Sequence, residues 1–252
     1  MKHILVCVKA VPVSSSVEVD GQHRLKRDGA SLQWNIADES ALEAAFRLAD
    51  RDGSVTVLTM GPPKLEGPLL ELLARGANRA VLITDRLMAG ADTRATARAL
   101  ASAAEKLGPF DAVFCGCKAI DGETGQVPGE LAAALGLLGR WGGPLYLLAT
   151  RRLEDGVQNL TVSGSAVISF SSYSYPLRLA GILGMRRARE TPVEILTAAD
   201  LGLTPEDCGL KGSLTKVVAM ESRFPGLRRG PKETDLDAGV QNLRVLLREV
   251  RP

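Results

Sequence analysis

One segment of this 252-residue chain constrains its fold more than any other, Asp111 to Gly136, with the sequence DAVFCGCKAIDGETGQVPGELAAALG. It opens with a short apolar run of the kind that a buried parallel strand requires, and it closes with an apolar-faced helical pattern. Between the two, Gly116, Gly122 and Gly125 allow sharp turns and a close approach of the backbone to a ligand. Thr124 and the amide groups that open the helix offer hydrogen bonds to a phosphate, and the helix N-terminus adds partial positive charge. The segment therefore predicts a strand, loop and helix that bind a nucleotide.

Strand and helix patterns alternate along the first half of the chain. Apolar runs predict strands near 4–9, 54–60, 79–84 and 111–116, separated by helical patterns near 37–52, 63–75, 90–107 and 126–139. In the first helix, Ala41, Leu42 and Ala45 belong to the inward stripe, and Glu43 and Arg47 lie outside it. This alternation predicts an α/β fold, with a Rossmann-like, mostly parallel sheet flanked by helices. Beyond 140 the alternation weakens, and shorter β-like pieces lie at 144–150 and 166–170.

The ends of these predicted strands indicate where a ligand binds. In open α/β sheets, ligands bind outside the carboxyl ends of the strands. The segments that follow strands are Cys7-Val8-Lys9-Ala10, Met60-Gly61-Pro62 and Gly116 to Val127, and the turn from Asn35 to Asp38 precedes the first helix. We therefore expect these four segments to meet at one edge of the sheet.

Composition excludes several other classes of protein. A net charge of +2 and 4% aromatic residues do not fit a surface that follows a phosphate backbone, so no nucleic-acid partner is expected. No apolar run approaches the ~20 residues of a membrane span, and the opening residues lack a signal-peptide pattern, so we expect no membrane insertion and a cytoplasmic location. The cysteines and the two histidines lack the spacing of a metal site, and we interpret the cysteines as reduced packing or loop residues.

The complete loop, Gly116-x-x-Ala119-Ile120-Asp121-Gly122-Glu123-Thr124-Gly125-Gln126-Val127, resembles the nucleotide loop of the electron transfer flavoprotein beta (small) subunit family. Further landmarks of that family follow in order: MKHILVCVKAVPV at the start, Asn35 to Ala45, VTVLTMGP from Val55, and Arg75 to Ala80. One departure is that Val127 is followed by Pro128-Gly129, whereas the commoner order is Gly-Pro. Proline has no donor N–H, so the amide at this position is the part of the loop that the departure affects.

The resemblance implies a bound nucleotide, typically AMP. Position by position, it assigns cofactor contacts to Cys7, Asn35, Ile36, Ala37, Asp38, Met60, Gly116, Cys117, Lys118, Ala119, Ile120, Asp121, Gly122, Glu123, Thr124, Gly125, Gln126 and Val127. At Cys7 and Met60 we expect backbone contacts, and packing of both side chains in the core is an equally good interpretation. Asp121 has three possible roles beside a phosphate: a helix cap, a partner of a ribose hydroxyl, or a partner of a cation.

The stretch from Ser171 to Arg189 resembles the partner-recognition segment of the same family, although the usual Pro-Arg pair is absent. Leu179 is the candidate apolar anchor for a flavin dehydrogenase, together with Ile182 and Leu183. The alternative is that Leu177, Leu179, Ile182 and Leu183 form the core face of a short helix. The preceding region, 151–166, has room for one brief hairpin.

The predicted organisation is a nucleotide-binding domain over 1–226, which includes the recognition segment 171–189, followed by a C-terminal arm and helix over 227–252. Gly and Pro mark the arm, and Leu236, Val240 and Leu243 stand at helical spacing after it. An arm that ends in an amphipathic helix is expected to pack on a partner. In the family, that partner is the larger alpha subunit, which carries FAD.

The resemblance implies an electron carrier subunit rather than a stand-alone catalyst, with no catalytic residue of its own. The complex would take electrons from flavin dehydrogenases, such as those acting on acyl-CoA, and pass them to a quinone reductase or another acceptor. One alternative is an electron-bifurcating member with a second FAD in the nucleotide site and NADH as donor. An alternative of another class is a stand-alone adenine-nucleotide-binding module of the universal-stress type.

Overall fold

The computed structural model describes residues 2–13, 18–19, 25–26, 31–49, 52–136, 146–218 and 234–249, with only the backbone at 18–19, 25–26, 146, 152 and 246–249. The chain divides into two compact units, Met1–Val218 and Ala219–Pro252. The predicted boundary between residues 226 and 227 and most of the predicted arm lie outside the described residues.

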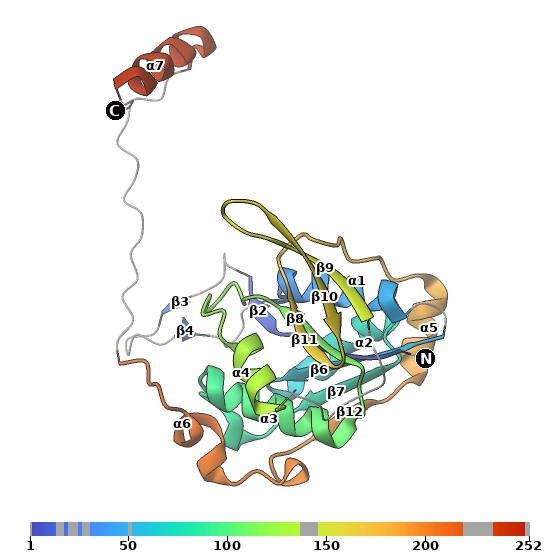
Figure 1. Ribbon diagram of the computed structural model, residues 1–252. Helices are drawn as coiled ribbons and strands as arrows, with labels where there is room; N and C mark the ends of the chain where they lie inside the picture. Colours follow the sequence, from blue (N-terminus) through green and yellow to red (C-terminus); the bar gives the residue numbers. More distant parts are fainter. Residues whose placement is uncertain are drawn as a thin grey trace. The chain divides into compact units, whose positions relative to one another are not determined.

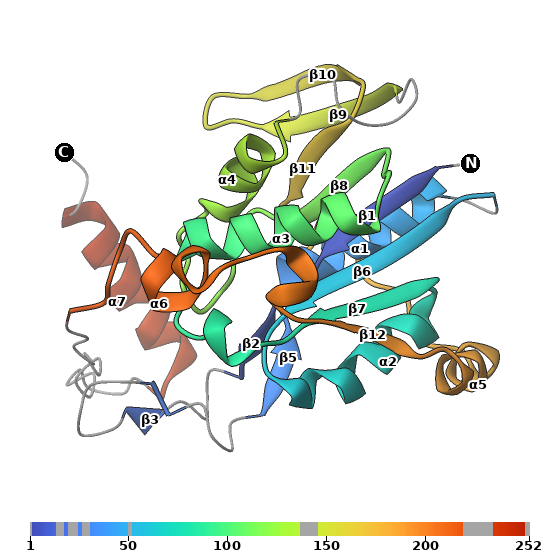
Figure 2. The same ribbon diagram turned by 90° about the horizontal axis from the view of Figure 1, so that it is seen from below.

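The first unit (Figure 1) is built on a parallel sheet of six strands in the order β11-β8-β1-β6-β7-β12, which can be followed in Figure 2. The strands are β1 (His3–Cys7), β6 (Ser54–Met60), β7 (Arg79–Ile83), β8 (Ala112–Gly116), β11 (Ala166–Phe170) and β12 (Val193–Leu196). Four of them coincide with the strands predicted from apolar runs, and β11 coincides with the β-like piece predicted at 166–170. The prediction of an α/β fold with a Rossmann-like parallel sheet is confirmed.

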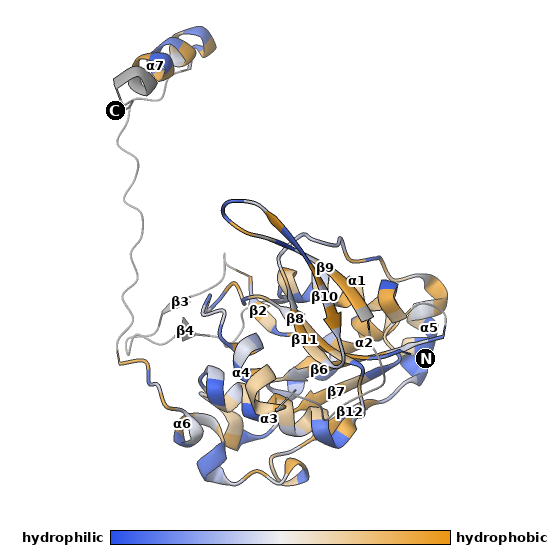
Figure 3. Ribbon diagram, viewed as in Figure 1, coloured by the Kyte–Doolittle hydropathy of each residue, from blue (hydrophilic) through white to orange (hydrophobic). Residues whose placement is uncertain are grey.

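Helices cover both faces of the sheet. The helices α1 (Ile36–Ala49) and α2 (Glu66–Arg75) share one core cluster with alternate sheet residues such as Val6 and Val57. The helices α3 (Thr93–Leu107) and α4 (Val127–Ala134) share the other cluster with Leu5 and Leu58. Successive strand residues thus point to opposite layers, as the period of a strand requires. Figure 2 shows α3 crossing the strands, and Figure 3 shows hydrophobic residues concentrated in the sheet.

Smaller antiparallel elements surround the sheet. The strand β2 (Ala10–Pro12) pairs with β5 (Leu32–Trp34), and β3 (Glu18–Val19) pairs with β4 (Leu25–Lys26). The strands β9 (Tyr146–Arg152) and β10 (Val157–Ser163) form a hairpin, which agrees with the brief hairpin expected before Ala166.

Short helices connect the remaining elements. The helix α5 (Ile182–Glu190) packs on α2, and the single-turn segments are η2 (Pro63–Leu65), η3 (Arg86–Met88), η4 (Ala199–Leu201), η5 (Pro205–Asp207) and α6 (Gly209–Gly212). The second unit contains α7 (Leu236–Glu249). Among the described helices, none combines the length and the apolar character needed to cross a bilayer.

Candidate nucleotide site

The order of the strands reverses beside β1. From β1 the sheet continues through β6 and β7 on one side and through β8 and β11 on the other. The carboxyl ends of β1 and β8 therefore diverge into separate loops, and a crevice between such loops is the usual ligand position in this class of sheet. These ends are Cys7 and Gly116, two of the residues that the sequence assigns to the nucleotide.

Asp38 joins the two strand ends. One carboxylate oxygen, Oδ2, accepts the backbone N–H of Lys9 at 2.8 Å, and Oδ1 accepts the backbone N–H of Gly116 at 2.7 Å. The side chain is buried, with 6% relative exposure. Burial raises the pKa of Asp38 to about 7, although hydrogen bonds from Lys9, Gly116 and Asn35 act in the opposite direction. The start of α1 thus fixes the distance between the loops after β1 and β8.

Gly116 must be glycine for this arrangement. A Cβ atom at this position would lie 2.4 Å from Asp38 Oδ1 and 2.7 Å from the Cβ of Ala37. Both neighbours belong to buried residues at the start of α1, so neither can move away easily. The glycine therefore allows the first turn of α1 to approach the end of β8.

Asn35 holds the loop that follows β8. Its Nδ2 donates to the carbonyl of Lys118 at 3.0 Å, and its Oδ1 accepts the N–H of Ile120 at 3.2 Å. Its own backbone N–H donates to the carbonyl of Lys9 at 2.9 Å. Asn35 is 1% exposed, so these bonds replace its contacts with water. One buried amide therefore connects the loops after β1 and β8 through backbone groups.

The loop displays backbone donors at the surface. Residues from Gly122 to Gln126 are exposed, and the N–H groups of Gly122, Thr124 and Gly125 make no hydrogen bond within the described part of the chain. Two residues adopt left-handed backbone, Glu123 with φ 49° and Gly125 with φ 64°. The N–H of Glu123, between these donors, is bonded to the carbonyl of Ala119. Three available donors shortly before a helix N-terminus are a favourable environment for a phosphate.

Asp121 opposes a cation. Its two carboxylate oxygens lie 2.7 Å and 2.8 Å from Nζ of Lys9, whose side chain is about half exposed. The helix α4 instead begins after Gln126, without a side-chain cap and with proline in its first turn. Of the three roles considered for Asp121, the structure contains the pairing with a cation, and capping of α4 is wrong. Lys9 belongs to the segment after the first strand that the sequence predicts at this edge, although it was not among the assigned cofactor contacts.

The Cys7 and Met60 side chains pack in the core on the α3 face, which agrees with the packing interpretation of both residues. Burial and the nearby Asp38 carboxylate raise the pKa of the Cys7 thiol to about 12, so this thiol is neutral and unreactive. Ala37 is buried, and Ile36 is half-buried at the start of α1. In the described part of the chain, no three His, Cys, Asp or Glu side chains gather as metal ligands would.

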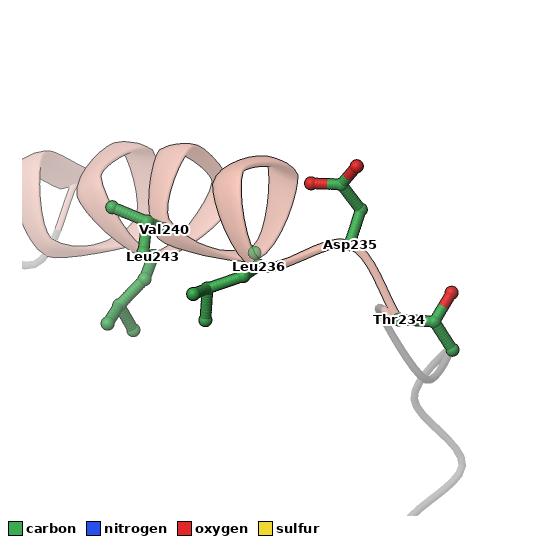
Figure 4. Close-up of a pocket in the computed structure, with 6 residues that line it drawn as sticks. Thr234, Asp235, Leu236, Val240 and Leu243 are labelled. Atoms are coloured by element: carbon green, nitrogen blue, oxygen red, sulfur yellow. The ribbon is translucent and has the colours of Figure 1, made fainter.

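The predicted recognition segment is exposed where its apolar anchors lie. Leu179, Ile182 and Leu183 are 86%, 81% and 82% exposed, whereas Leu177 packs partly against the core. The alternative that all four leucine and isoleucine side chains form the core face of a helix is therefore wrong for three of them. A second exposed apolar surface lies on α7, where Figure 4 shows Leu236 and Leu243 on the same side of the helix.

One prediction about α1 is wrong. The helical pattern placed Glu43 outside the buried stripe, but the side chain is only 4% exposed. The reason is that Arg178, which is 135 residues away in the sequence, covers this position. Helical periodicity carries no information about a later segment that folds over the polar face.

Comparison with known proteins decides the family. The model of the family described as "Electron transfer flavoprotein domain" matches residues 24–138. The electron transfer flavoprotein subunit beta of Thermoanaerobacterium thermosaccharolyticum is 39% identical in an alignment 258 residues long, which covers 96% of each chain. This chain belongs to the electron transfer flavoprotein beta subunit family. The protein FixA of Azorhizobium caulinodans is also 39% identical, over 93% of this chain and 88% of the relative.

A further relative of this beta subunit family carries a more specific name. The caffeyl-CoA reductase-Etf complex subunit CarD of Acetobacterium woodii is 35% identical over 85% of this chain and 85% of its own length. The resemblance first identified from the glycine loop and its neighbouring landmarks is thus confirmed over nearly the whole chain.

Proposed function

We propose that this chain is the nucleotide-binding subunit of a heterodimeric electron transfer flavoprotein, with AMP at the carboxyl edge of β1 and β8. The proposal rests on the backbone N–H groups of Gly122, Thr124 and Gly125, which have no partner in the described part of the chain and lie in the loop that follows β8, whose end Asp38 joins to the loop after β1. A phosphate satisfies such donors without a change of the loop. Lys9, paired here with Asp121, and Lys118, paired with Glu123, place positive charge at this edge.

The remaining positions of the predicted site divide into two groups. Asn35, Ala37, Asp38 and Gly116 form the buried frame, while the exposed or half-buried residues of the first turn of α1 and of the loop meet the ligand: Ile36 and Cys117 to Val127. At Cys7 and Met60 only the backbone would face the ligand, because both side chains pack in the core. This division supports recognition of the nucleotide mainly through main-chain groups.

The redox chemistry belongs to FAD. The alpha subunit carries the FAD, and this chain supports the FAD-binding domain of that subunit. FAD, when bound, accepts and releases the electrons. The exposed apolar side of α7, with Leu236, Val240 and Leu243, suits packing on that subunit. In this proposal the chain binds, orients and docks, and none of its residues is catalytic.

Docking of the electron donor is assigned to Leu179, Ile182 and Leu183. Three large apolar side chains that are each more than 80% exposed on one short segment are characteristic of a partner surface. The proposed donor is a flavin dehydrogenase, such as one acting on acyl-CoA, and the acceptor is a quinone reductase or an equivalent protein.

A second candidate is the electron-bifurcating form, with a second FAD in place of AMP and NADH as donor. The similarity to a subunit named as part of a caffeyl-CoA reductase-Etf complex supports this second candidate. The AMP half of FAD presents the same phosphate and adenosine as AMP, so the loop geometry suits both. A stand-alone nucleotide-binding module is disfavoured, because it has no use for the exposed leucines of Ser171–Arg189 or for α7.

The test is to express this chain together with the alpha subunit, purify the complex, denature it, and count the released nucleotides by chromatography and mass spectrometry. One AMP and one FAD per complex is the expected result. Two FAD and no AMP would establish the second candidate. Failure of the two chains to form a complex, with reversible AMP binding by this chain alone, would contradict the proposal.

A further inference from the structure

A charge network around one buried carboxylate connects α1 with the segment Ser171–Arg189, here called the docking segment. Glu43 lies in the middle of α1 with 4% relative exposure. Its carboxylate accepts hydrogen bonds from two arginines, Arg47 on the next turn of α1 and Arg178 in the docking segment. Nothing in the nucleotide site requires a buried carboxylate at this position, since Asp38 and Asn35 already hold the loops there.

Arg178 binds Glu43 through both its side chain and its backbone. Its Nε donates to Oε2 at 2.9 Å and its Nη2 donates to Oε1 at 3.1 Å, which is the two-point geometry typical of arginine and carboxylate. The backbone N–H of Arg178 also donates to Oε2, at 3.2 Å. The carboxylate therefore fixes the main chain directly before Leu179.

The other side of the same residue is also held. The carbonyl of Arg178 accepts a hydrogen bond from Nη1 of Arg75 at 2.8 Å, and its guanidinium lies 4.7 Å from the ring centre of Phe46. Both peptide groups of Arg178 are thus tied to the helices beneath. The direction in which Leu179 leaves the surface is set by these bonds.

The neighbouring residues alternate between the core and the surface. Tyr175 lies 6.1 Å from the ring of Phe170, edge to face, and Leu177 and Ala180 pack partly against the core. Leu179 points outward, at 86% exposure. A surface leucine on a fixed backbone loses less conformational freedom on binding than one on a free loop, which favours affinity.

We propose that Glu43 is a positioning residue for partner docking, which acts through Arg178 to hold Leu179 in the orientation that the dehydrogenase binds. The inference rests on the docking role proposed above. Since α1 also begins with the residues that frame the nucleotide site, the same helix supports both surfaces of the subunit.

The charge state of Glu43 agrees with this role. Burial by itself raises the pKa of its carboxyl, but hydrogen bonds from Arg178 and Arg47 outweigh burial and lower the pKa below its ordinary value. Glu43 is therefore ionised at neutral pH and accepts all of these bonds at once.

The test uses the complex of this chain with its alpha subunit, and an acyl-CoA dehydrogenase reduced with butyryl-CoA as the electron donor. In Glu43→Gln, the side-chain shape is kept, but an amide NH2 faces the arginines. We expect the KM for the complex to rise about tenfold, with kcat and the AMP and FAD content unchanged. Glu194→Gln is the matched control, because it removes an ion pair with Arg79 elsewhere on the protein and should leave the KM unchanged.

A double-mutant cycle separates positioning from general stability. If Glu43 acts through Leu179, the Leu179→Ala variant should be no further weakened by Glu43→Gln, whereas independent effects would multiply. Hydrogen exchange of the backbone amide of Arg178, which donates to Glu43, should be faster in Glu43→Gln. Arg178→Lys, at a side chain that is 44% exposed, keeps the charge but loses the two-point contact, and should repeat both effects if Glu43→Gln folds poorly.

An unchanged KM together with unchanged exchange in Glu43→Gln would overturn the inference. Effects of Glu43→Gln and Leu179→Ala that multiply would also overturn it. If Leu179→Ala leaves electron transfer unchanged, the docking role fails instead, and the exchange measurement still reports whether Glu43 holds the segment.

Discussion

Two buried carboxylates on the same helix, Asp38 and Glu43, hold different functional surfaces by different electrostatic means. Asp38 accepts backbone N–H groups from Lys9 and Gly116, and burial raises its pKa to about 7. Glu43 accepts two arginine side chains as well as one backbone N–H, and these bonds lower its pKa. At the nucleotide edge, a buried carboxylate that has no arginine partner in the described part of the chain fixes the backbone, and its burial is unfavourable for the charged form. In the docking segment, the negative charge of Glu43 is balanced by the arginines that hold it.

The largest expected effect is on how stability depends on pH. The pKa of Asp38 is about 7 in the folded chain, compared with 3.8 as its ordinary value, so the folded state binds the extra proton between these values. Its contribution to stability is therefore greatest below pH ~4 and falls as the pH rises to ~7, by as much as about 4 kcal/mol. Urea unfolding of the wild type and Asp38→Asn across this range measures the difference.

Asp38→Asn lacks this titration, so the stability of the wild type relative to the variant should decline from pH 4 to pH 7. The stability of the wild type relative to Glu43→Gln should instead decline as the pH falls. The stabilisation from an acid with a lowered pKa is present above its ordinary pKa of 4.5 and is lost at lower pH. Parallel stability curves for all three proteins would refute the contrast between the two carboxylates.

Gly116→Ala tests the geometry of the nucleotide edge. The added Cβ would meet Asp38 and Ala37 at less than 3 Å, so we expect a loss of about 3 kcal/mol in unfolding free energy and of bound nucleotide. Gly122→Ala is the matched control in the same loop, with no atom within 4 Å of the added Cβ and ordinary backbone. It should change stability by less than about 0.5 kcal/mol, and equal losses in both variants would contradict the account.

Leu179→Ala tests the docking surface. Truncation of an anchor that enters a partner pocket costs about 2 kcal/mol of binding, so electron transfer from the dehydrogenase should weaken roughly 30-fold in kcat/KM. The nucleotide content and the assembly with the alpha subunit should not change. Leu148→Ala, at a leucine of β9 that is 90% exposed, is the matched control. Similar donor kinetics in both variants would remove Leu179 from the docking surface.

The smallest effect is expected at Gly125. Its φ of 64° lies in the left-handed region, and an added Cβ would make only an ordinary contact, at 3.6 Å from the carbonyl of Cys117. Gly125→Ala should therefore lose about 1 kcal/mol through backbone strain alone. Gly125→Asn should lose less, because asparagine tolerates this conformation better. Thermal unfolding of the two variants provides the comparison, and an equal loss would argue against strain as the cause.

Local sequence patterns were sufficient to predict the main elements of the fold. The apolar runs at 54–60 and 79–84 became β6 and β7 almost residue for residue, since a strand buried on both faces has few alternatives. Ligands bind at the carboxyl ends of parallel strands, and this rule predicts that the turn containing Asp38 lies near Gly116, as the hydrogen bond between them confirms.

Individual side-chain pairs between distant residues could not be predicted from local sequence patterns. The pair Lys9 and Asp121 and the pair Glu43 and Arg178 join residues more than 100 positions apart. Glu43 stands on a side of its helix that the pattern predicts to face solvent, and the loop pattern does not choose a cation among the three possible partners of Asp121. Only the topology of the sheet and the path of the docking segment bring these charges together.

A crystal structure of the purified complex with the alpha subunit shows directly whether the carboxyl edge of β1 and β8 holds a nucleotide. We expect an adenine nucleotide whose phosphate accepts hydrogen bonds from the backbone N–H groups of Gly122, Thr124 and Gly125. An empty edge in a complex that still carries its FAD on the alpha subunit would contradict it.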